Sequence, residues 1–467
     1  MQAADTITQE ALAARYEEIQ QVYMNDARPW IIGYSGGKDS TTALQLIWHA
    51  LAQLPEPNRK KPMYIISSDT LVETPKIVEY IDTSLQRINE AARAQHLPFS
   101  AHKVRPKIDD SFWVNLIGRG YPAPSTQFRW CTERLKIDPA NRFILERVAE
   151  HREVVVVLGV RRSESATRAQ VMSLHRIKGS VLSRHSTLAN AYVYTPIEDF
   201  STNAVWTYLL QVPSPWGNNN RDLVTMYRNA QAGECPLVVD KTTQSCGNSR
   251  FGCWVCTVVN RDASMEAMID NGEEWLEPLL QFRNMLAGTQ DPTVKAQVRS
   301  LKRRNGQVML KANGDGFVYG PYKMTERKKY LEALLQIQQQ IQRTGPNPEQ
   351  LLITPAELAE IRRIWRTEEQ DWEDSVPKIY RRVTGEDFAW EKDEVPGFSA
   401  LDRQTLDVIC AKHTVPSALL AKLLDTERLY SRASRRSGVQ NTIASVLAEE
   451  WRSEQEILEA EKPDDSN

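Results

Sequence analysis

A short apolar run that enters a glycine-rich turn and leaves it as a helix constrains the fold more than any other part of the sequence. Residues 30–34 read WIIGY, residues 35–40 read SGGKDS, and residues 41–48 return to apolar positions at helical spacing. A buried strand followed at once by a helix is typical of parallel sheets, because parallel strands need a crossover connection. The chain is therefore expected to contain an α/β domain.

Further strands and helices alternate after this unit. Apolar runs at 63–68, 102–104 and 153–159 predict strands, the last with four consecutive valines. Helical spacing at 6–25, and a helix start at Thr74-Pro75, predict helices around them. Helical patterns dominate the C-terminal part. The predicted fold is α/β, a doubly wound parallel sheet with a cysteine-cluster insertion and a mostly helical C-terminal region.

The length of 467 residues suggests about two to four domains. No apolar run reaches the length of a membrane-spanning helix, and the N-terminus lacks the apolar core of a secretory signal. A cytoplasmic location without membrane contact is therefore expected. The expected regions are an α/β nucleotide domain at 1–220, a cysteine segment at 221–290, a basic and helical region at 291–450, and a disordered acidic tail at 451–467.

The turn after the first predicted strand has the composition of a phosphate-binding loop. Two adjacent glycines let the backbone approach a phosphate and turn its N–H groups toward it. Lys38 adds a positive charge, and the start of the next helix adds the positive end of a helix dipole. The spacing is not that of the Walker A motif. The residues predicted to cradle pyrophosphate are Ser35, Gly36, Gly37, Lys38, Asp39 and Ser40.

Arginines follow the four-valine strand, at the edge where open α/β sheets bind ligands. Arg161 and Arg168 come shortly after Gly159. Guanidinium groups match the oxygens of phosphate or sulfate. These residues are expected to contribute to the same nucleotide site.

The motifs together resemble a known superfamily. SGGKDS resembles the PP-loop of the ATP pyrophosphatases, also called adenine nucleotide alpha hydrolases. Residues 159–168 and 195–209 look like segments of the phosphoadenylylsulfate (PAPS) reductase branch, so the resemblance covers about residues 25–215. It implies ATP as the nucleotide and places Ser67 and Asp69, at the end of the second predicted strand, near the adenosine.

Four of the six cysteines fall within 22 residues, as Cys235-x10-Cys246-x6-Cys253-x2-Cys256. Four thiolates suit Zn²⁺ or an iron–sulfur cluster, and the spacing alone does not decide between them. A zinc ribbon usually has two Cys-x2-Cys pairs, and this chain has one, which favours the 4Fe–4S cluster. Cys235, Cys246, Cys253 and Cys256 are therefore the predicted metal ligands.

The two other cysteines have different surroundings. Cys131 lies among Arg129, Arg134 and Lys136, and these charges would favour a reactive thiolate. The alternative is a structural thiol near a basic loop. Cys410 has helical apolar neighbours and is expected to be a core residue.

The net charge of −2 hides two opposite segments. Residues 295–329 contain ten Lys and Arg against two acidic residues, interleaved with aromatic side chains. Residues 449–467 contain eight acidic residues against two basic ones. The basic block could bind the phosphates and bases of DNA. An acidic protein partner or a solvated basic face would explain it as well.

The PP-loop, the separate Cys131 and the cysteine spacing together resemble the DndC family of sulfurtransferases, which act in bacterial DNA phosphorothioation. The resemblance implies a 4Fe–4S cluster, ATP and Mg²⁺ as cofactors. It implies DNA, a cysteine desulfurase as sulfur source and other DNA phosphorothioation proteins as partners. In this interpretation, a DNA backbone phosphate is adenylylated with release of pyrophosphate, and sulfur then replaces a non-bridging oxygen. Cys131, Lys38 and Asp39 are the expected catalytic residues.

Two other functions are compatible with the sequence. A PAPS reductase-like enzyme would act on a small nucleotide, which does not require the long C-terminal region. A non-catalytic nucleotide-sensing subunit of a DNA-modification complex would not require an intact phosphate loop.

Overall fold

The computed structural model describes residues 8–164, 166–230, 252–312, 316–390, 397–431 and 436–460. The chain divides into two compact units, and each is described by itself. The first comprises residues 1–111 and 124–283, and the second comprises residues 112–123 and 284–467. Within the described ranges, no helix is long and apolar enough to cross a membrane.

The first unit is built on a six-stranded sheet with the order β3-β2-β1-β4-β6-β5. Five strands are parallel, and β5 pairs antiparallel with β6 at one edge. The prediction of a mostly parallel α/β sheet is confirmed, but β5 and β6 were not predicted. The strands are β1 (Trp30–Gly33), β2 (Met63–Ser68), β3 (Phe99–Val104), β4 (Val154–Val157), β5 (Ser183–Arg184) and β6 (Ala191–Tyr194).

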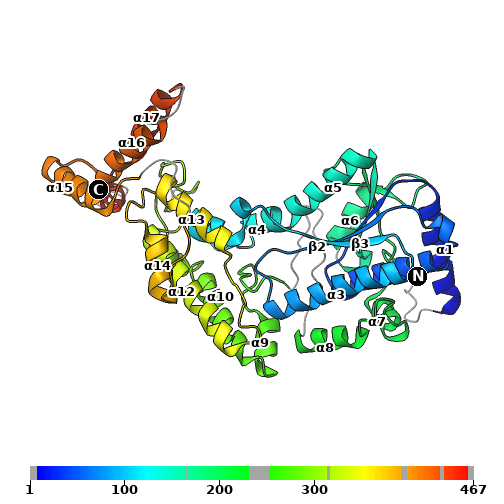
Figure 1. Ribbon diagram of the computed structural model, residues 1–467. Helices are drawn as coiled ribbons and strands as arrows, with labels where there is room; N and C mark the ends of the chain where they lie inside the picture. The colour runs from blue at the N-terminus through cyan, green and yellow to red at the C-terminus, as the bar shows by residue number, and fades with distance from the viewer. Residues whose placement is uncertain are drawn as a thin grey trace, which may run out of the picture. The chain divides into compact units, whose positions relative to one another are not determined.

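Helices cover both faces of this sheet, as the alternation of buried side chains requires. On one face, Trp30 and Ile32 of β1 share a core with helices α1, α2, α3 and α7. On the other face, Ile31 of β1 packs with α5. Figure 1 shows α5 and α6 on one side of the sheet and α3, α7 and α8 on the other. The helices are α1 (Gln9–Met24), α2 (Lys38–Ala52), α3 (Pro75–Ala94), α4 (Trp130–Thr132), α5 (Asp138–His151), α6 (Ala166–Leu174), α7 (Thr202–Gln211), α8 (Asn220–Ala230), α9 (Ala263–Asp270) and α10 (Glu277–Gly288), which continues into the second unit.

The strand order predicts a ligand site at the carboxyl edge of the sheet. β1 lies in the centre, the chain continues on one side through β2 and β3, and β4 then pairs on the other side of β1. Open α/β sheets bind ligands outside the carboxyl ends of their strands at such a point. The loops after β1, β2 and β4 therefore meet at one edge.

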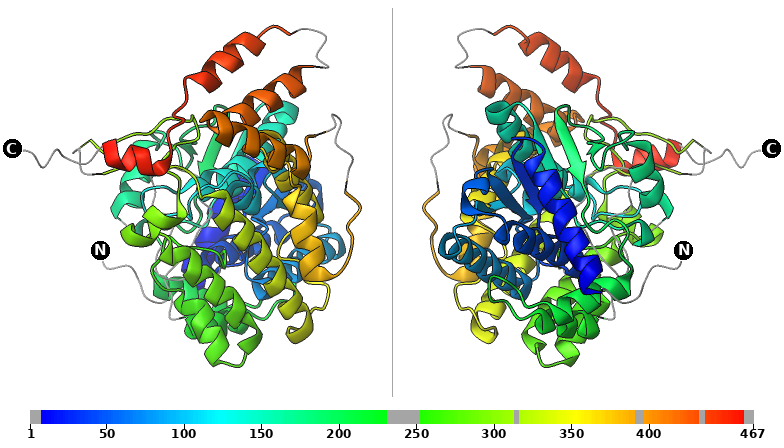
Figure 2. Two further views of the ribbon diagram at one scale, coloured as in Figure 1. Left: turned by 90° about the vertical axis from the view of Figure 1, so that its left-hand side faces the viewer. Right: turned by 90° about the vertical axis from the view of Figure 1, so that its right-hand side faces the viewer.

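The second unit is mostly helical, as the sequence predicts. Two buried tryptophans tie its segments together, because the indole of Trp113 donates to the Leu352 carbonyl (2.6 Å) and that of Trp365 donates to the Ile117 carbonyl (3.0 Å). Figure 2 shows α16 and α17 side by side. The helices are α11 (Pro292–Val298), α12 (Met324–Thr344), α13 (Pro355–Glu368), α14 (Ser375–Thr384), α15 (Ala400–His413), α16 (Ser417–Tyr430), α17 (Val439–Leu447) and α18 (Glu454–Ala460).

The acidic C-terminal segment is ordered where the structure describes it, so the expectation of a disordered tail is wrong for residues 451–460. Residues 454–460 form α18, and Ile457 is buried against Leu301 and Phe317. Lys323 pairs with Glu454 across 2.8 Å. Apolar packing and charge pairing therefore attach this segment to the basic block.

Candidate active site

The glycine-rich turn connects β1 to α2 and is held in one conformation. Gly36 has a φ of +70°, and a Cβ there would lie 2.4 Å from the side chain of Ile81, so the position requires glycine. The backbone N–H of Ser35 donates to the Ser40 hydroxyl (3.2 Å), which donates to the Gly37 carbonyl (3.1 Å). The loop thus directs the start of α2 toward the carboxyl edge of the sheet.

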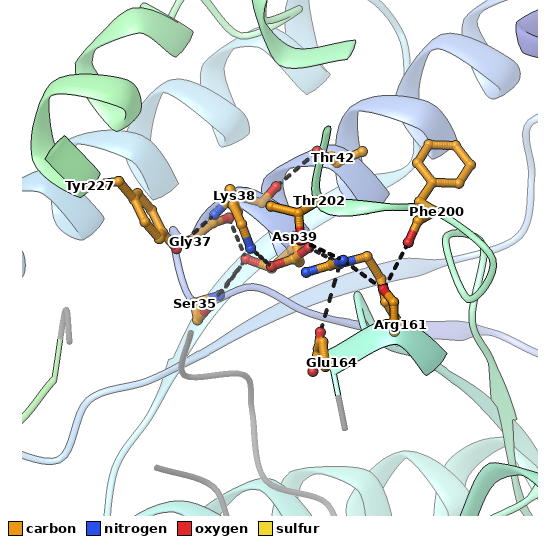
Figure 3. Close-up of polar contacts among 12 residues, drawn as sticks. Ser35, Gly37, Lys38, Asp39, Thr42, Arg161, Glu164, Phe200, Thr202 and Tyr227 are labelled. Atoms are coloured by element: carbon orange, nitrogen blue, oxygen red, sulfur yellow. Dashed lines mark hydrogen bonds and ion pairs between the residues drawn. The ribbon is translucent and has the colours of Figure 1, made fainter. Parts of the chain in front are cut away.

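Asp39 is the centre of a buried charge network, shown in Figure 3. One carboxylate oxygen lies 2.6 Å from Lys38 Nζ, and the other lies 2.6 Å from Arg161 Nε. Arg161 also donates to the hydroxyls of Ser163 (2.9 Å) and Thr202 (3.2 Å). All three charged side chains are buried. The network joins the loop after β4 to the first turn of α2.

Gly159 explains how β4 and α2 approach so closely. A Cβ on Gly159 would lie 2.7 Å from the Asp39 carbonyl oxygen and 2.8 Å from the Ser40 backbone nitrogen. These are backbone atoms, so they cannot give way as a side chain would. The predicted residues Gly159, Arg161 and Asp39 therefore lie together, whereas Arg168 lies in α6 and its side chain is outside the described part.

The loop after β2 contributes two carboxylates. Asp69 accepts from Arg105 Nε (2.8 Å) and lies 3.5 Å from Lys103 Nζ, so β3 and the residue that follows it supply its cations. Glu73 accepts from both the backbone N–H (2.9 Å) and the hydroxyl (2.6 Å) of Thr70. Ser67 is buried within β2. Asp69 therefore follows the carboxyl end of β2, whereas Ser67 lies within the strand.

The Cys-x2-Cys pair docks on this same loop. The Cys253 sulfur lies 3.3 Å from the Thr70 hydroxyl, and the Trp254 backbone N–H donates to the Val72 carbonyl (2.9 Å). A turn in which the Cys256 N–H donates to the Cys253 carbonyl (3.1 Å) links the two cysteines. The cysteine pair thus lies at the carboxyl end of β2, the strand next to β1.

Two buried side chains, Trp254 and Arg283, attach the cysteine turn to the rest of the first unit. Trp254 packs against Phe282, with ring centroids 6.0 Å apart. The guanidinium of Arg283 is buried and donates to the carbonyls of Cys256 (2.9 Å) and Asn260 (3.0 Å). This arrangement makes the turn part of the folded unit.

The electrostatics around Cys253 fit a bound cation. Burial raises the pKa of the Cys253 thiol to about 12, and the charge of Glu73 acts in the same direction, whereas Lys136 opposes both. Burial also raises the pKa of Glu73. A metal centre would add positive charge to that of Lys136 and so stabilise the thiolate, and the Cys-x2-Cys turn itself fits half of a four-cysteine site.

The other half of the predicted metal site, Cys235 and Cys246, lies outside the described residues. Among those described, no three His, Cys, Asp or Glu side chains gather as metal ligands. The choice between zinc and a 4Fe–4S cluster stays a prediction. Cys410 is buried in α15, which confirms its expected place in a core.

Cys131 is half-buried in α4, in a segment that adjoins the cysteine turn. The hydroxyl of Thr257 donates to the Pro124 carbonyl (2.6 Å), and the charge of Lys136 acts on Cys253 and Glu73. Arg134, expected beside Cys131, pairs with Asp110. The segment that carries Cys131 therefore borders the loop after β2.

The basic block in the second unit is partly used within that unit. Arg327 is buried and pairs with Glu369 (2.9 Å). Arg299 donates to the carbonyls of Tyr319 and Gly320 (2.6 and 2.7 Å). Lys302 lies over the ring of Trp451. The ten cations therefore do not form one solvated basic face.

Sequence reasoning missed two contributors to the loop. Thr202, in the first turn of α7, accepts from Arg161, and Tyr227 in α8 contacts Lys38. Thr202 lies within the 195–209 segment that resembles the PAPS reductase branch but is not one of its marked residues, and Tyr227 lies outside every motif. Each reaches this network only through tertiary packing. The resemblance of residues 195–209 was therefore the one signal for Thr202, and no signal in the sequence distinguishes Tyr227 from other helical residues.

Comparisons with known proteins cover the region just described. Residues 29–259 match the family model of the phosphoadenosine phosphosulfate reductase domain. An uncharacterized protein of Methanocaldococcus jannaschii is 27% identical over 203 residues, which are 42% of this chain and only 35% of that relative. The family match extends from β1 to just beyond the Cys253–Cys256 turn.

Two solved structures are similar in part. One is a PAPS reductase from Candida auris in complex with phosphate, with 14% identity and a TM-score of 0.29 over 47% of this chain and 93% of that chain. The other is the U34-tRNA thiolase NcsA from Methanococcus maripaludis with its 4Fe–4S cluster, with 12% identity and a TM-score of 0.27 over 62% of this chain and 81% of that chain.

Proposed function

Because residues 29–259 match the family model of the PAPS reductase domain, we propose that this chain is an ATP-dependent sulfurtransferase. Its proposed substrate is a non-bridging oxygen of the DNA backbone, as in DNA phosphorothioation. One observation carries the proposal. The sulfur of Cys253 lies 3.3 Å from Thr70, at the end of the strand that neighbours the phosphate-loop strand. The proposed metal site and the nucleotide site would therefore share one edge of the sheet.

The first step is activation of the substrate oxygen. A non-bridging phosphate oxygen attacks the α-phosphorus of ATP, a P–O bond forms, and the bond to the β-phosphate oxygen breaks. Pyrophosphate leaves with the electron pair. Lys38 and the N–H groups at the start of α2 stabilise its charge, with a Mg²⁺ ion carried by the nucleotide.

In this step Asp39 positions the side chain of Lys38. Its carboxylate contacts two cations, Lys38 and Arg161, so Mg²⁺ would compete with both for it. We therefore assign Asp39 to holding Lys38 in place. Arg161 in turn holds Asp39, so its role is also indirect.

The second step introduces sulfur. Cys131 carries a persulfide made by a cysteine desulfurase, and its terminal sulfur attacks the adenylylated phosphorus. A P–S bond forms, and AMP leaves with the electron pair. Two equivalents of a thiol reductant then cleave the S–S bond, which regenerates the Cys131 thiol and leaves sulfur on the phosphate. Cys253 and Cys256, together with Cys235 and Cys246, would hold a 4Fe–4S cluster, which supplies redox-active iron beside the site.

DNA and protein partners would meet the second unit. Its exposed cations Arg303, Arg304 and Lys311 suit phosphate contacts. The C-terminal helices offer surfaces for other phosphorothioation proteins.

The position of ATP cleavage tests the proposal. We expect α-labelled ATP to give labelled AMP and unlabelled pyrophosphate in the presence of duplex DNA and a sulfur source. Lys38→Met should abolish the reaction, whereas Lys60→Met, an exposed lysine of the same unit, should not. Release of ADP and phosphate, or no cleavage, would contradict the proposal. Full DNA modification by Lys38→Met would favour a nucleotide-sensing subunit.

The matched family favours a second function, reduction of a sulfated nucleotide. Incubation with PAPS and a thiol reductant distinguishes the two. Sulfite release, with no turnover of ATP, would support the reductase and contradict the sulfurtransferase.

A further inference from the structure

The hydroxyl of Tyr227, in α8, accepts a hydrogen bond from the backbone of the phosphate loop. The backbone N–H of Lys38 donates to the Tyr227 hydroxyl across 3.2 Å, and Lys38 Nζ lies 5.7 Å from the centre of the tyrosine ring. A Cβ on Gly37 would lie 3.0 Å from the same hydroxyl. Figure 3 shows the tyrosine side chain reaching the loop at Gly37 and Lys38. The hydroxyl therefore lies directly against the loop backbone.

The Lys38 N–H that donates to Tyr227 is a group that would also bind a phosphate oxygen. Lys38 is the first residue of α2, and the N–H groups of a helix's first turn have no partner within the helix. Phosphate oxygens bind such N–H groups, assisted by the helix dipole. The tyrosine hydroxyl and a phosphate oxygen thus compete for the same hydrogen atom.

The position of Tyr227 is defined by the packing of α8. At the start of this helix, Asn220 exchanges hydrogen bonds with Gln45 of α2 (2.8 and 3.2 Å). Near its end, the ring of Trp206 packs edge-on against Tyr227, with centroids 5.1 Å apart. Contacts at both ends of the described helix therefore fix the position of the hydroxyl next to the loop.

We propose that Tyr227 is a built-in competitor of the nucleotide, whose hydroxyl leaves the Lys38 N–H when a phosphate oxygen binds there. The inference rests on the proposed binding of ATP by the loop. It deepens that proposal, because the Tyr227 side chain must then move away from the loop on binding, and Cys235 follows Tyr227 by eight residues in the sequence. Nucleotide binding would thereby act on the helix that leads into the cysteine motif.

Calorimetry on full-length variants tests the competition. The probe is an ATP analogue with a methylene group between the α- and β-phosphorus. Tyr227→Phe keeps the ring but removes the competing oxygen, so we expect the analogue to bind about twofold to tenfold more tightly, the range of one net hydrogen bond. Tyr192→Phe removes a hydroxyl that donates to Glu153 in another part of the unit, and its affinity should match that of the wild type.

The outcomes separate this inference from the proposed function. Equal or weaker binding by Tyr227→Phe would overturn the competition while leaving the nucleotide site intact. No binding by any variant would overturn both. As a second readout, fluorotyrosine at position 227 should change its ¹⁹F chemical shift when the analogue binds. An unchanged shift at saturating analogue would overturn the displacement.

Discussion

Arg161 holds Asp39 across 2.6 Å, and this one contact joins the loop after β4 to the first turn of α2. Both side chains are buried, so neither charge is compensated by water. The arginine fork has further partners in Ser163 and Thr202, which fix its plane. The pair therefore acts as the structural support of the phosphate loop.

Removing the arginine should destabilise the first unit. Arg161→Met leaves Asp39 buried with only part of its compensation, and loss of one partner of a buried pair costs about 3 kcal/mol. We expect a lower urea midpoint and much weaker ATP binding. Arg162→Met is the matched control, because Arg162 is exposed and its ion pair with Glu198 should contribute little. Equal effects of the two substitutions would show that the buried pair is not the support.

Gly159→Ala should disrupt the loop with a single methyl group. The new Cβ would lie 2.7 Å from the Asp39 carbonyl oxygen, so the start of α2 must move. We expect at least tenfold weaker binding of an ATP analogue, with the secondary structure retained by circular dichroism. Gly288→Ala meets no atom within 4 Å and should bind the analogue normally. Normal affinity of Gly159→Ala would contradict the close approach of β4 to α2.

Iron content should separate the cysteines by role. Cys253→Ser is expected to lower the iron per chain in anaerobically purified protein, because it removes one predicted ligand. Cys131→Ser should abolish sulfur incorporation and leave the iron content unchanged. Cys410→Ser is a control for a buried cysteine elsewhere. A zinc-only wild-type protein with full activity would contradict the iron–sulfur prediction, and loss of iron in Cys131→Ser would mean that Cys131 belongs to the cluster.

The C-terminal helix offers a matched pair of neighbours. Ile457 is 1% exposed and packs with Leu301 and Phe317, whereas Leu458 is 47% exposed. Ile457→Ala should lower the free energy of unfolding of the second unit by about 2–4 kcal/mol through lost burial and the remaining cavity. Leu458→Ala should change it by less than about 1 kcal/mol. Similar small effects, measured by urea denaturation, would show that α18 does not contribute to the core.

The sequence predicts those parts of the fold that depend on local pattern. The strand, turn and helix from Trp30 to Ala52 are adjacent in the chain, so their apolar spacing and glycines suffice. The docking of Cys253 beside Thr70 joins residues 183 positions apart, and local pattern contains no information about it. The same holds for Tyr227 and the phosphate loop.

Charge patterns were the weaker guide. The acidic segment is expected to be disordered because charged residues dominate it, yet the buried Ile457 and the Lys323–Glu454 pair attach it to the second unit. The basic block is compatible with DNA binding, an acidic protein partner or a solvated face, yet Arg327 and Arg299 make their contacts within the unit itself. The position of a Lys or Arg in the sequence does not show whether a carboxylate or carbonyl from another segment binds it in the fold.

We propose that ATP activation and sulfur insertion occur on DNA at this one edge of the sheet. Mass spectrometry of nuclease-digested duplex DNA tests it most directly, after incubation with the iron-loaded protein, ATP, a cysteine desulfurase, cysteine and a thiol reductant. The account predicts phosphorothioate-linked dinucleotides, absent without ATP and absent with Lys38→Met or Cys131→Ser. Unmodified DNA from a protein that cleaves ATP to AMP and pyrophosphate would contradict it.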